Sequence, residues 1–329
     1  MIIVTGGAGF IGSAIVAALN ERGRDDIVIV DDVDHSEKEH NISNLRYDQM
    51  IGIKEFREQL LAEEFDNQNV EAIIHMGACS STTETNWEYL EDNNVEYTKD
   101  IIRWCQSHHT RCIYASSAAT YGNGEHGYDD DVKLFDILEP LNLYGKSKLL
   151  VDIWARDGRF LDQAVGLRFF NVFGPNEWHK EAMMSVVAKK YPEIAQGKEM
   201  TLFKSYEEKY NDGEQKRDFI YIQDAVRAVL FFLDHPDIGG VYNVGTGTAR
   251  SWLDVARAMF SAVNTAEKIV FIDMPEHIKH QYQYFTQADM KKLVGVGFDT
   301  AENYVLEDAI CEYVQGYLAP HRHIGEAVL

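Results

Sequence analysis

Short apolar runs alternate with longer amphipathic stretches through the first half of the chain. Runs with the length of a buried strand are Ile2–Val4, Ile27–Val30, Ala72–His75, Cys112–Tyr114 and Ala164–Phe170. The stretches between them have helical spacing, including a long one from about Trp87 to Ser107. Strands that alternate with helices in this way predict an α/β protein with a Rossmann-type, doubly wound parallel sheet. Ligands of such sheets bind beyond the carboxyl ends of the strands.

The pattern becomes less regular from Asn171 onward. It predicts a further strand and helix within 218–234, a short strand with a glycine turn at 241–247, and another strand at 269–272. Residues 206–215 have the composition of an exposed loop, and we expect 321–329 to be a flexible tail.

The composition narrows the classes of partner. Hydrophobic residues make up 45% of the 329 residues, and no apolar run approaches the ~18 residues of a membrane span. Met1 is followed directly by Ile-Ile-Val-Thr, without the charged and apolar regions of a secretory signal, so we expect a cytoplasmic protein. The net charge of −22 argues against nucleic acids and anionic membranes as partners. An anionic substrate would therefore need a local basic pocket.

Residues that commonly bind metal ions show no metal-site spacing. The four cysteines form no C-x-x-C pair, which indicates neither a zinc site nor a disulfide framework. His35 and His40 flank Lys38, but no further ligands converge on them in the sequence, and we interpret both as exposed loop histidines. We therefore predict no metal.

A glycine-rich turn separates the first strand from the first helix. Residues 6–12 form G-x-x-G-x-x-G, which lets a pyrophosphate approach backbone N–H groups at a helix N-terminus. The second strand ends at Asp31 and Asp32, about 20 residues after the loop, where an acid suits the ribose 2′-hydroxyl of NAD. A 2′-phosphate would need a cation, and Lys38 is the only basic residue close by in the sequence. NAD and NADP both stay open.

A tyrosine and a lysine four residues apart are candidates for redox chemistry. Tyr144 and Lys148 lie on a predicted helix, where this spacing places them on one face. An ammonium beside a phenol favours the phenolate, so that the tyrosine can act as a general base near neutral pH. Most such pairs are solvated helix surface, but here they accompany the glycine loop and a serine-rich strand end that contains Ser117.

Together these motifs resemble the extended short-chain dehydrogenase/reductase superfamily of nucleotide-sugar enzymes. Several segments are similar to the ADP-glycero-manno-heptose 6-epimerase family in particular: His75–Glu84, Tyr114–Gly122, Phe170–Pro175 with His179-Lys180, Lys216–Phe219 and Phe285–Asp289. The resemblance runs from Met1 to about residue 315. Its most specific parts are Cys-Ser-Ser-Thr-Thr-Glu at 79–84 and Phe-Thr-Gln-Ala-Asp at 285–289.

This resemblance implies two domains and an epimerase. Residues 1–170 and about 219–246 would form an NAD(P)-binding Rossmann domain, and about 171–218 and 247–320 a smaller α/β substrate-binding domain. The family inverts C6″ of the heptose in an ADP-sugar, a precursor of the lipopolysaccharide core, and holds NADP tightly, or less often NAD. The implied reaction oxidises the 6″-hydroxyl to a ketone and returns the same hydride to the other face. The resemblance also suggests a homo-oligomer, with a pentamer as one form.

Such a reaction needs an acid/base on each side of the carbon. The resemblance implies that Tyr144 and Lys180 take these two roles, that Lys148 holds the nicotinamide ribose, and that Ser117 hydrogen-bonds the reacting oxygen. The implied cofactor contacts are Gly6, Gly9, Phe10, Ile11, Gly12, Asp31, Asp32, Lys38, Met76, Gly77, Ala78, Cys79, Ser80, Asn93, Lys148, Val172 and Lys180. The implied substrate contacts are Asn171, Ala182, Lys189, Phe203, Lys204, Ser205, Tyr206, Arg217 and Tyr282. Arg217 is the candidate for the diphosphate, because a guanidinium can bond two oxygens at once.

Other hypotheses stay open. Asp32 stands where the family usually has asparagine, which adds negative charge near a 2′-phosphate and weakens the prediction of NADP. A UDP-sugar 4-epimerase could work without Lys180. A 4,6-dehydratase is disfavoured, because Ala118 and Ala119 stand where those enzymes place an Asp-Glu pair. A non-catalytic NAD(P)-binding regulator could dispense with the Tyr/Lys pair that this chain keeps.

Overall fold

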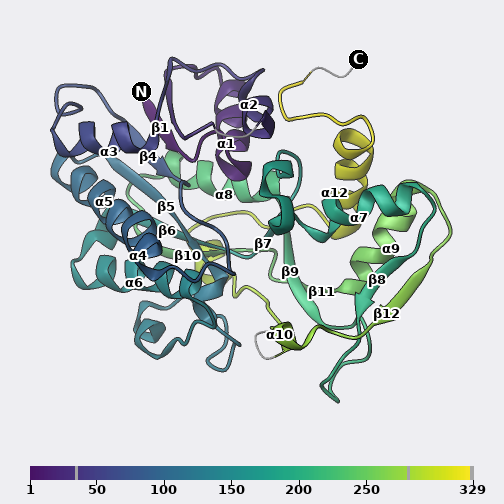
Figure 1. Ribbon diagram of the computed structural model, residues 1–329. Coiled ribbons are helices and arrows are strands. Elements are labelled where there is room, and N and C mark those ends of the chain that lie inside the picture. The colour runs from purple at the N-terminus through teal and green to yellow at the C-terminus, as the bar shows by residue number, and fades with distance from the viewer. Residues whose placement is uncertain (34–35, 280–281, 327–329) are drawn as a thin grey trace.

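Seven parallel strands form the central sheet of the computed structural model, which describes residues 1–33, 36–279 and 282–326 (Figure 1). Their order across the sheet is β3-β2-β1-β4-β5-β6-β10, and every neighbouring pair is parallel. The strands are β1 (Ile2–Thr5), β2 (Ile27–Val30), β3 (Gln49–Ile51), β4 (Ala72–His75), β5 (Arg111–Ser117), β6 (Ala164–Phe169) and β10 (Gly240–Val244). The predicted α/β fold is therefore confirmed. The strand order reverses between β1 and β4, where sheets of this type bind ligands.

Helices cover both faces of this sheet. They are α1 (Phe10–Glu21), α3 (Ile53–Leu61), α5 (Tyr97–His108), α6 (Leu143–Asp157) and α8 (Ile222–Asp234). Ile2 and Val4 of β1 belong to the core that contains α1 and α8, whereas Ile3 packs in the core that contains α3 and α5. Because both faces are buried, β1, β2 and β4 are buried at every position, which explains why they are continuous apolar runs.

The long helix predicted from Trp87 to Ser107 is interrupted rather than uniform. It consists of α4 (Trp87–Leu90), a π-helical segment (Glu91–Glu96) and α5. A π-helical segment widens the backbone by one residue per turn and is frequent at functional sites. Here it turns Asn94 inward, where this side chain is completely buried.

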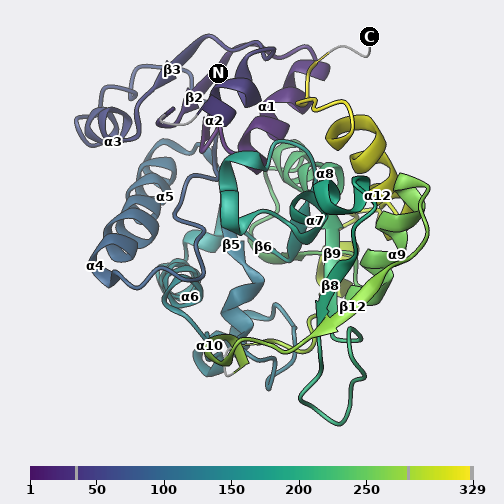
Figure 2. The ribbon, with the colours of Figure 1, turned by 45° about the vertical axis from the view of Figure 1, so that its right-hand side comes forward.

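Two small sheets lie beside the large one (Figure 1). One has the order β11-β9-β7 and the other pairs β12 with β8. Their strands are β7 (Asn171–Phe173), β8 (Met200–Phe203), β9 (Lys216–Tyr221), β11 (Ala249–Ser251) and β12 (Ile269–Ile272), and the nearby helices are α7 (Val186–Ala195), α9 (Trp252–Val263) and α12 (Leu306–Tyr313). The loop between β8 and β9 extends beyond these sheets at the bottom of Figure 2. Strand β10, from the later segment assigned to the Rossmann domain, lies at the edge of the large sheet next to β6.

Short helices complete the described structure. They are α2 (Ser36–Ile42), α10 (Glu276–Lys279) and α11 (Lys291–Gly295), with 3₁₀ segments at Ala118–Tyr121, Val132–Ile137, Phe160–Asp162 and Trp178–Met183 and a π-helical segment at Val314–Leu318. None of the helices in the described part of the chain combines the length and the apolar character of a membrane span.

The C-terminal segment packs against the N-terminal part of the chain as far as Glu326. We predicted a flexible tail from 321, but His323 is only 3% exposed and its Nδ1 lies 2.9 Å from Oδ1 of Asn41. The backbone N–H of Ile324 donates to Asn176 at 2.9 Å. Residues 321–326 are therefore packed, whereas 327–329 lie outside the described residues, as does His35.

Candidate active site

A cavity of about 410 Å³ opens where β1, β4, β5 and β6 end. It collects side chains from the glycine loop, the loop after β4, helix α6 and the 3₁₀ segment after β7. The predicted site residues that line it are Phe10, Ile11, Met76, Ala78, Ser80, Ser117, Tyr144, Lys148, Asn171, Val172, Lys180 and Lys189. The carboxyl end of the sheet thus brings together the redox pair, both predicted acid/bases and much of the predicted cofactor site.

The glycine loop has the geometry of a pyrophosphate cradle. Gly6 has φ +65°, and a Cβ there would lie 2.7 Å from the backbone nitrogen of Gly77. A Cβ on Gly12 would lie 2.0 Å from the carbonyl oxygen of Gly6. Helix α1 begins directly after Gly9, which caps it without a side chain. The first N–H groups of a helix have no intrahelical acceptor, so they can bind a phosphate that approaches this side-chain-free loop.

The loop after β4 is held by side chains that sequence reasoning did not select. Thr5 Oγ1 accepts from the backbone N–H of Gly77 at 3.1 Å and lies 2.6 Å from Nδ1 of His75. Burial lowers the pKa of His75 to about 3, so this ring stays neutral. Because both groups are buried and hydrogen-bonded, they fix the backbone that faces the glycine loop.

Asn94 fixes the next part of that loop. Its Oδ1 accepts from the backbone N–H of Cys79, and its Nδ2 donates to the carbonyl of Cys79, both at 2.9 Å. Nδ2 also lies 3.1 Å from Oγ of Ser147, on the same helix as the redox pair. Asn93, which we predicted as a cofactor contact, donates to Oδ1 of Asn94 and does not line the cavity. The sequence feature that could have identified Asn94 is an amide side chain in the middle of a predicted helical stretch.

The two carboxylates at the end of β2 form hydrogen bonds within the protein. Asp31 is 4% exposed, and its Oδ2 accepts from the backbone N–H of Ala8 at 3.0 Å. Its Oδ1 lies 3.1 Å from Nζ of Lys38, which also donates to the carbonyl of Asp32. The Asp32 carboxylate accepts from the backbone N–H of Ile53, at the start of α3. The three predicted residues therefore meet at one place, with an ammonium among the carboxylates.

Tyr144, Ser117 and Lys148 lie together in the cavity. Ser117 caps a 3₁₀ turn, because its Oγ accepts from the backbone N–H of Ala119 at 3.1 Å. Burial raises the pKa of Tyr144, and a hydrogen bond with Ser117 opposes this rise. The ammonium of Lys148 donates to the carbonyl of Ala115 at 2.8 Å, and burial lowers its pKa to about 8. The sequence predicted a lowered pKa for Tyr144, but in the structure the effect of burial is the larger one.

Lys180 lines the same cavity from the segment that follows β7. It lies in the 3₁₀ segment Trp178–Met183, and its ammonium is 5.0 Å from the ring centroid of Phe10. Burial lowers the pKa of Lys180, the Glu177 carboxylate opposes this, and Lys189 adds to it. Glu177 is held in turn by the hydroxyl of Tyr313, which donates at 3.1 Å. A half-buried amine with a lowered pKa is suited to exchange a proton.

A second cavity of about 560 Å³ adjoins the first, because the two share the lining residues Val186, Lys189 and Trp252. Phe203 and Tyr282, both predicted substrate contacts, line it. Arg217 is 6% exposed, and its guanidinium lies 5.2 Å from the ring centroid of Tyr282. Burial lowers the pKa of Arg217. A pairing of Arg217 with Asp218 is disfavoured, because that carboxylate accepts from Thr246, Gly247 and Ala288.

Arg217 lines neither cavity, and four further predicted substrate residues also lie outside both cavity linings. Lys204 pairs with Asp273 at 3.2 Å, and the hydroxyl of Tyr206 donates to the same carboxylate at 3.0 Å. Oγ of Ser205 donates to the carbonyl of Glu207. The carbonyl of Ala182 accepts from Nζ of Lys189 at 3.2 Å, which places it at the cavity rim.

A buried ion pair supports the floor of the site. Asp152 and Arg168 are both fully buried and lie 2.9 Å apart. Asp152 also accepts from the hydroxyls of Tyr114 and Ser116, so that it ties α6 to β5 and β6. Sequence reasoning missed this pair, although an arginine within the apolar run 164–170 indicates a buried partner.

Comparisons with known proteins agree with this geometry. The model of the NAD dependent epimerase/dehydratase family matches residues 2–245. A protein of Nitratidesulfovibrio vulgaris strain DP4 named ADP-L-glycero-D-manno-heptose-6-epimerase is 48% identical over 97% of this chain and 98% of its own. One of Fusobacterium nucleatum with the same name is 46% identical over 97% and 98%. A crystal structure of the Helicobacter pylori protein of that name has a TM-score of 0.79 at 28% identity and covers 96% of this chain and 95% of that one.

Proposed function

Because the chain belongs to the NAD dependent epimerase/dehydratase family, we propose that it inverts C6″ of ADP-D-glycero-D-manno-heptose to give ADP-L-glycero-D-manno-heptose. The observation that carries this proposal is the cavity that Tyr144 and Lys180 line from separate elements of the fold. Inversion at a carbon bearing a hydroxyl needs proton exchange with that oxygen in two orientations of the sugar. Two ionisable groups in one cavity meet this need.

The residues present fit a dinucleotide. When bound, NAD(P) would supply reversible hydride transfer, through which the 6″-carbon could pass to a ketone and back. The first turn of α1 would hold the pyrophosphate, since its first N–H groups have no intrahelical acceptor and the loop before it has glycine at 6 and 9. Lys148 would hold the nicotinamide ribose.

The chain's own residues would manage the protons. Tyr144 keeps its proton in the free protein, because burial raises its pKa, and Ser117 orients the phenol through their hydrogen bond. Lys180 releases a proton more readily than an exposed lysine, because burial lowers its pKa. The two groups can therefore exchange the role of acid and base as the sugar turns between them. Arg217, whose guanidinium faces the ring of Tyr282 at the lining of the adjoining cavity, would bind the diphosphate.

We propose NADP as the cofactor. The carboxylate of Asp32 accepts a hydrogen bond from the backbone N–H of Ile53, at the start of α3. The N-terminus of this helix therefore stabilises its negative charge. Lys38 places an ammonium at the end of β2, where a 2′-phosphate would need it. Cofactor released from the purified protein and tested with an NADP-specific dehydrogenase distinguishes the two nucleotides; release of NAD alone would refute the proposal.

The decisive experiment follows C6″ by NMR after incubation with ADP-D-glycero-D-manno-heptose. We expect inversion with the wild type, and a loss of at least ~100-fold in Lys180→Ala and in Tyr144→Phe, with the bound cofactor retained. Lys198→Ala, on the exposed surface, is the matched control and should turn over normally. Unchanged turnover in Lys180→Ala would exclude a second acid/base at this position. The homo-oligomer, a pentamer by resemblance, stays a prediction that light scattering after gel filtration tests.

A further inference from the structure

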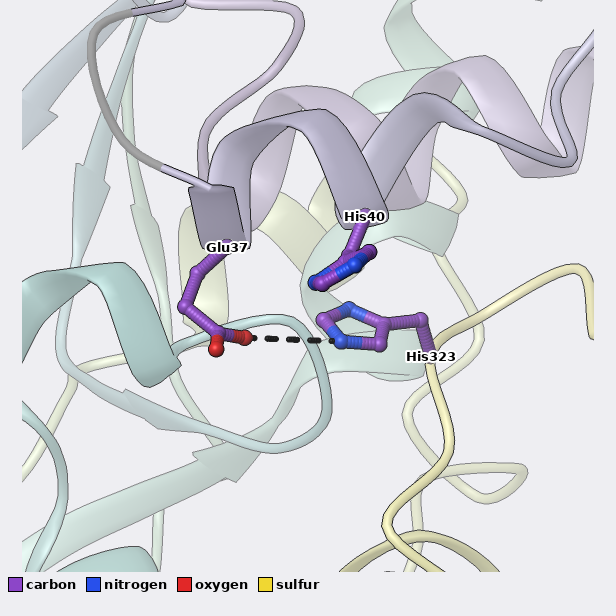
Figure 3. A group of neighbouring side chains, drawn as sticks. All are labelled: Glu37, His40 and His323. Atoms are coloured by element: carbon purple, nitrogen blue, oxygen red, sulfur yellow. Dashed lines mark ion pairs between the residues drawn. The ribbon is translucent and has the colours of Figure 1, made fainter.

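Three side chains with metal-binding atoms meet where the C-terminal segment crosses α2. They are Glu37 and His40 of α2 and His323 of the C-terminal segment (Figure 3). One ligand atom from each lies within 4.8 Å of the other two. We propose that these residues bind a divalent transition-metal ion of the zinc type, which fastens the C-terminal segment to α2.

The helix supplies two of the ligands on one face. Glu37 and His40 are three residues apart, a spacing that places side chains next to each other on a helix surface. Figure 3 shows both pointing toward the imidazole of His323, which enters from the other segment. This third ligand is far away in the sequence, which explains why the sequence predicted no metal site around His40.

Hydrogen bonds fix the orientation of the His323 ring. The amide nitrogen of Asn41 donates to the carbonyls of Ala8 and Asn176 at 3.0 and 3.2 Å, so its amide oxygen must face Nδ1 of His323. An amide oxygen only accepts, and Nδ1 therefore carries a hydrogen. A metal-binding histidine commonly donates its second ring N–H to an oxygen of this kind.

The ring then directs Nε2 toward a carboxylate. Nε2 of His323 lies 3.5 Å from Oε2 of Glu37. With Nδ1 as the donor, Nε2 faces the carboxylate either as the N–H of an imidazolium or as the lone pair of the neutral ring, and in the neutral form a bound cation between the two acceptors holds them together. Two ligand atoms bound to one tetrahedral zinc ion are roughly 3.4 Å apart, close to the separation seen here.

The remaining ligand needs only a side-chain movement. His40 is exposed, and its ring centroid lies 5.4 Å from that of His323. Two histidines and one glutamate are a donor set that zinc accepts, with a fourth position left for water. The buried His323 side chain, 4% exposed, and the half-buried Glu37, 24% exposed, limit access to one side.

The proposed metal site would stabilise a segment that lies next to the glycine loop. Asn41 connects it to the carbonyl of Ala8, and Lys38 on the same helix contacts Asp31. A bound ion would therefore hold the C-terminal segment, α2 and the end of β2 together. This consequence does not depend on which sugar the enzyme uses.

Zinc binding tests the proposal on the untagged full-length chain after removal of metals with EDTA. Competition with a chromogenic chelator should show one Zn²⁺ per wild-type chain, and at least ~100-fold weaker binding in His40→Ala and Glu37→Gln. His40 is exposed, so its replacement leaves the core intact, and His126→Ala, also exposed, is the matched control that should bind like the wild type.

Proteolysis tests the fastening separately. Trypsin can cut after Arg322, next to the proposed ligand. Zinc should slow this cut at least fivefold in the wild type and leave its rate unchanged in His40→Ala. The variant therefore also controls for any direct effect of zinc on the protease. The proposal is overturned if the wild type binds no zinc, if His40→Ala binds it as tightly as the wild type, or if zinc protects both chains from the cut equally.

Discussion

Replacement of Lys148 by methionine should change the pH dependence of folding stability. Lys148 is 4% exposed, and burial lowers the pKa of its ammonium from 10.5 to about 8. Below pH 8 the lysine is charged in the folded and the unfolded chain, so the folded state carries the full cost of burying the charge. Between pH 8 and 10.5 the unfolded chain holds more protons, and this cost disappears as the pH rises.

The size of the effect follows from the shift. About 2.5 pKa units at 1.36 kcal/mol each correspond to a cost of about 3.4 kcal/mol at pH 7. At pH 9.5 most folded chains have released the proton and most unfolded chains have not, which leaves about 1.4 kcal/mol. The difference in unfolding free energy between Lys148→Met and the wild type should therefore move by about 2 kcal/mol between these pH values, with the variant favoured at pH 7.

Urea denaturation of the cofactor-free proteins, followed by circular dichroism at pH 7, 8, 8.75 and 9.5, measures this difference. A comparison of the two proteins at each pH cancels the contributions of the buried tyrosines and cysteines to the unfolding free energy, because both chains contain these residues. Lys146→Met removes an exposed ammonium from the same helix and should show no such trend. A constant difference between Lys148→Met and the wild type across this range would refute the buried-charge argument.

Three further changes test the supports of the site. Gly12→Ala places a Cβ 2.0 Å from the carbonyl of Gly6 and should yield protein without bound nucleotide, as judged by absorbance after denaturation, whereas Gly295→Ala, in open space, should retain it. Asp152→Asn leaves the buried Arg168 charge uncompensated and should cost about 3–5 kcal/mol in urea denaturation, against less than ~0.5 kcal/mol for the exposed Asp157→Asn. Asn94→Ala removes four hydrogen bonds, of which Asn93→Ala removes one, and should cost about 2–3 kcal/mol, clearly more than Asn93→Ala; equal losses would show that Asn94 does not hold the loop after β4.

The large sheet could be predicted because its strands are buried on both faces. Such strands are continuous apolar runs, and their spacing by helices leaves few topologies. Strand β3 was missed because it has three residues, of which only Ile51 is buried. Helix α7 was not predicted, and Pro192 in its interior argues against a helix on propensity alone. The helix forms because the packing of Val187 and Ile194 outweighs the cost of the proline.

The site could be predicted where chemistry depends on residues close in sequence. The glycine loop and the Tyr/Lys pair are local motifs, and the structure places both at the same cavity. The supports of that cavity join distant positions instead: Asp152 with Arg168, and His323 with Asn41. Pairings of this kind depend on the completed fold, and a single sequence contains at most the hint that a polar residue in an apolar run needs a partner.

The spacing of Tyr144 and Lys148 also shows what a local motif leaves undetermined. Four residues on a helix set the face, but the pKa of the phenol depends on how much water reaches it. In the structure the Lys148 ammonium is turned to the carbonyl of Ala115, and burial raises the pKa of Tyr144. The free protein therefore holds a protonated tyrosine together with a lysine at 180 whose pKa burial lowers. In the proposed reaction, Tyr144 would hold its proton more firmly, and Lys180 would release its proton more readily, than the same groups do in water.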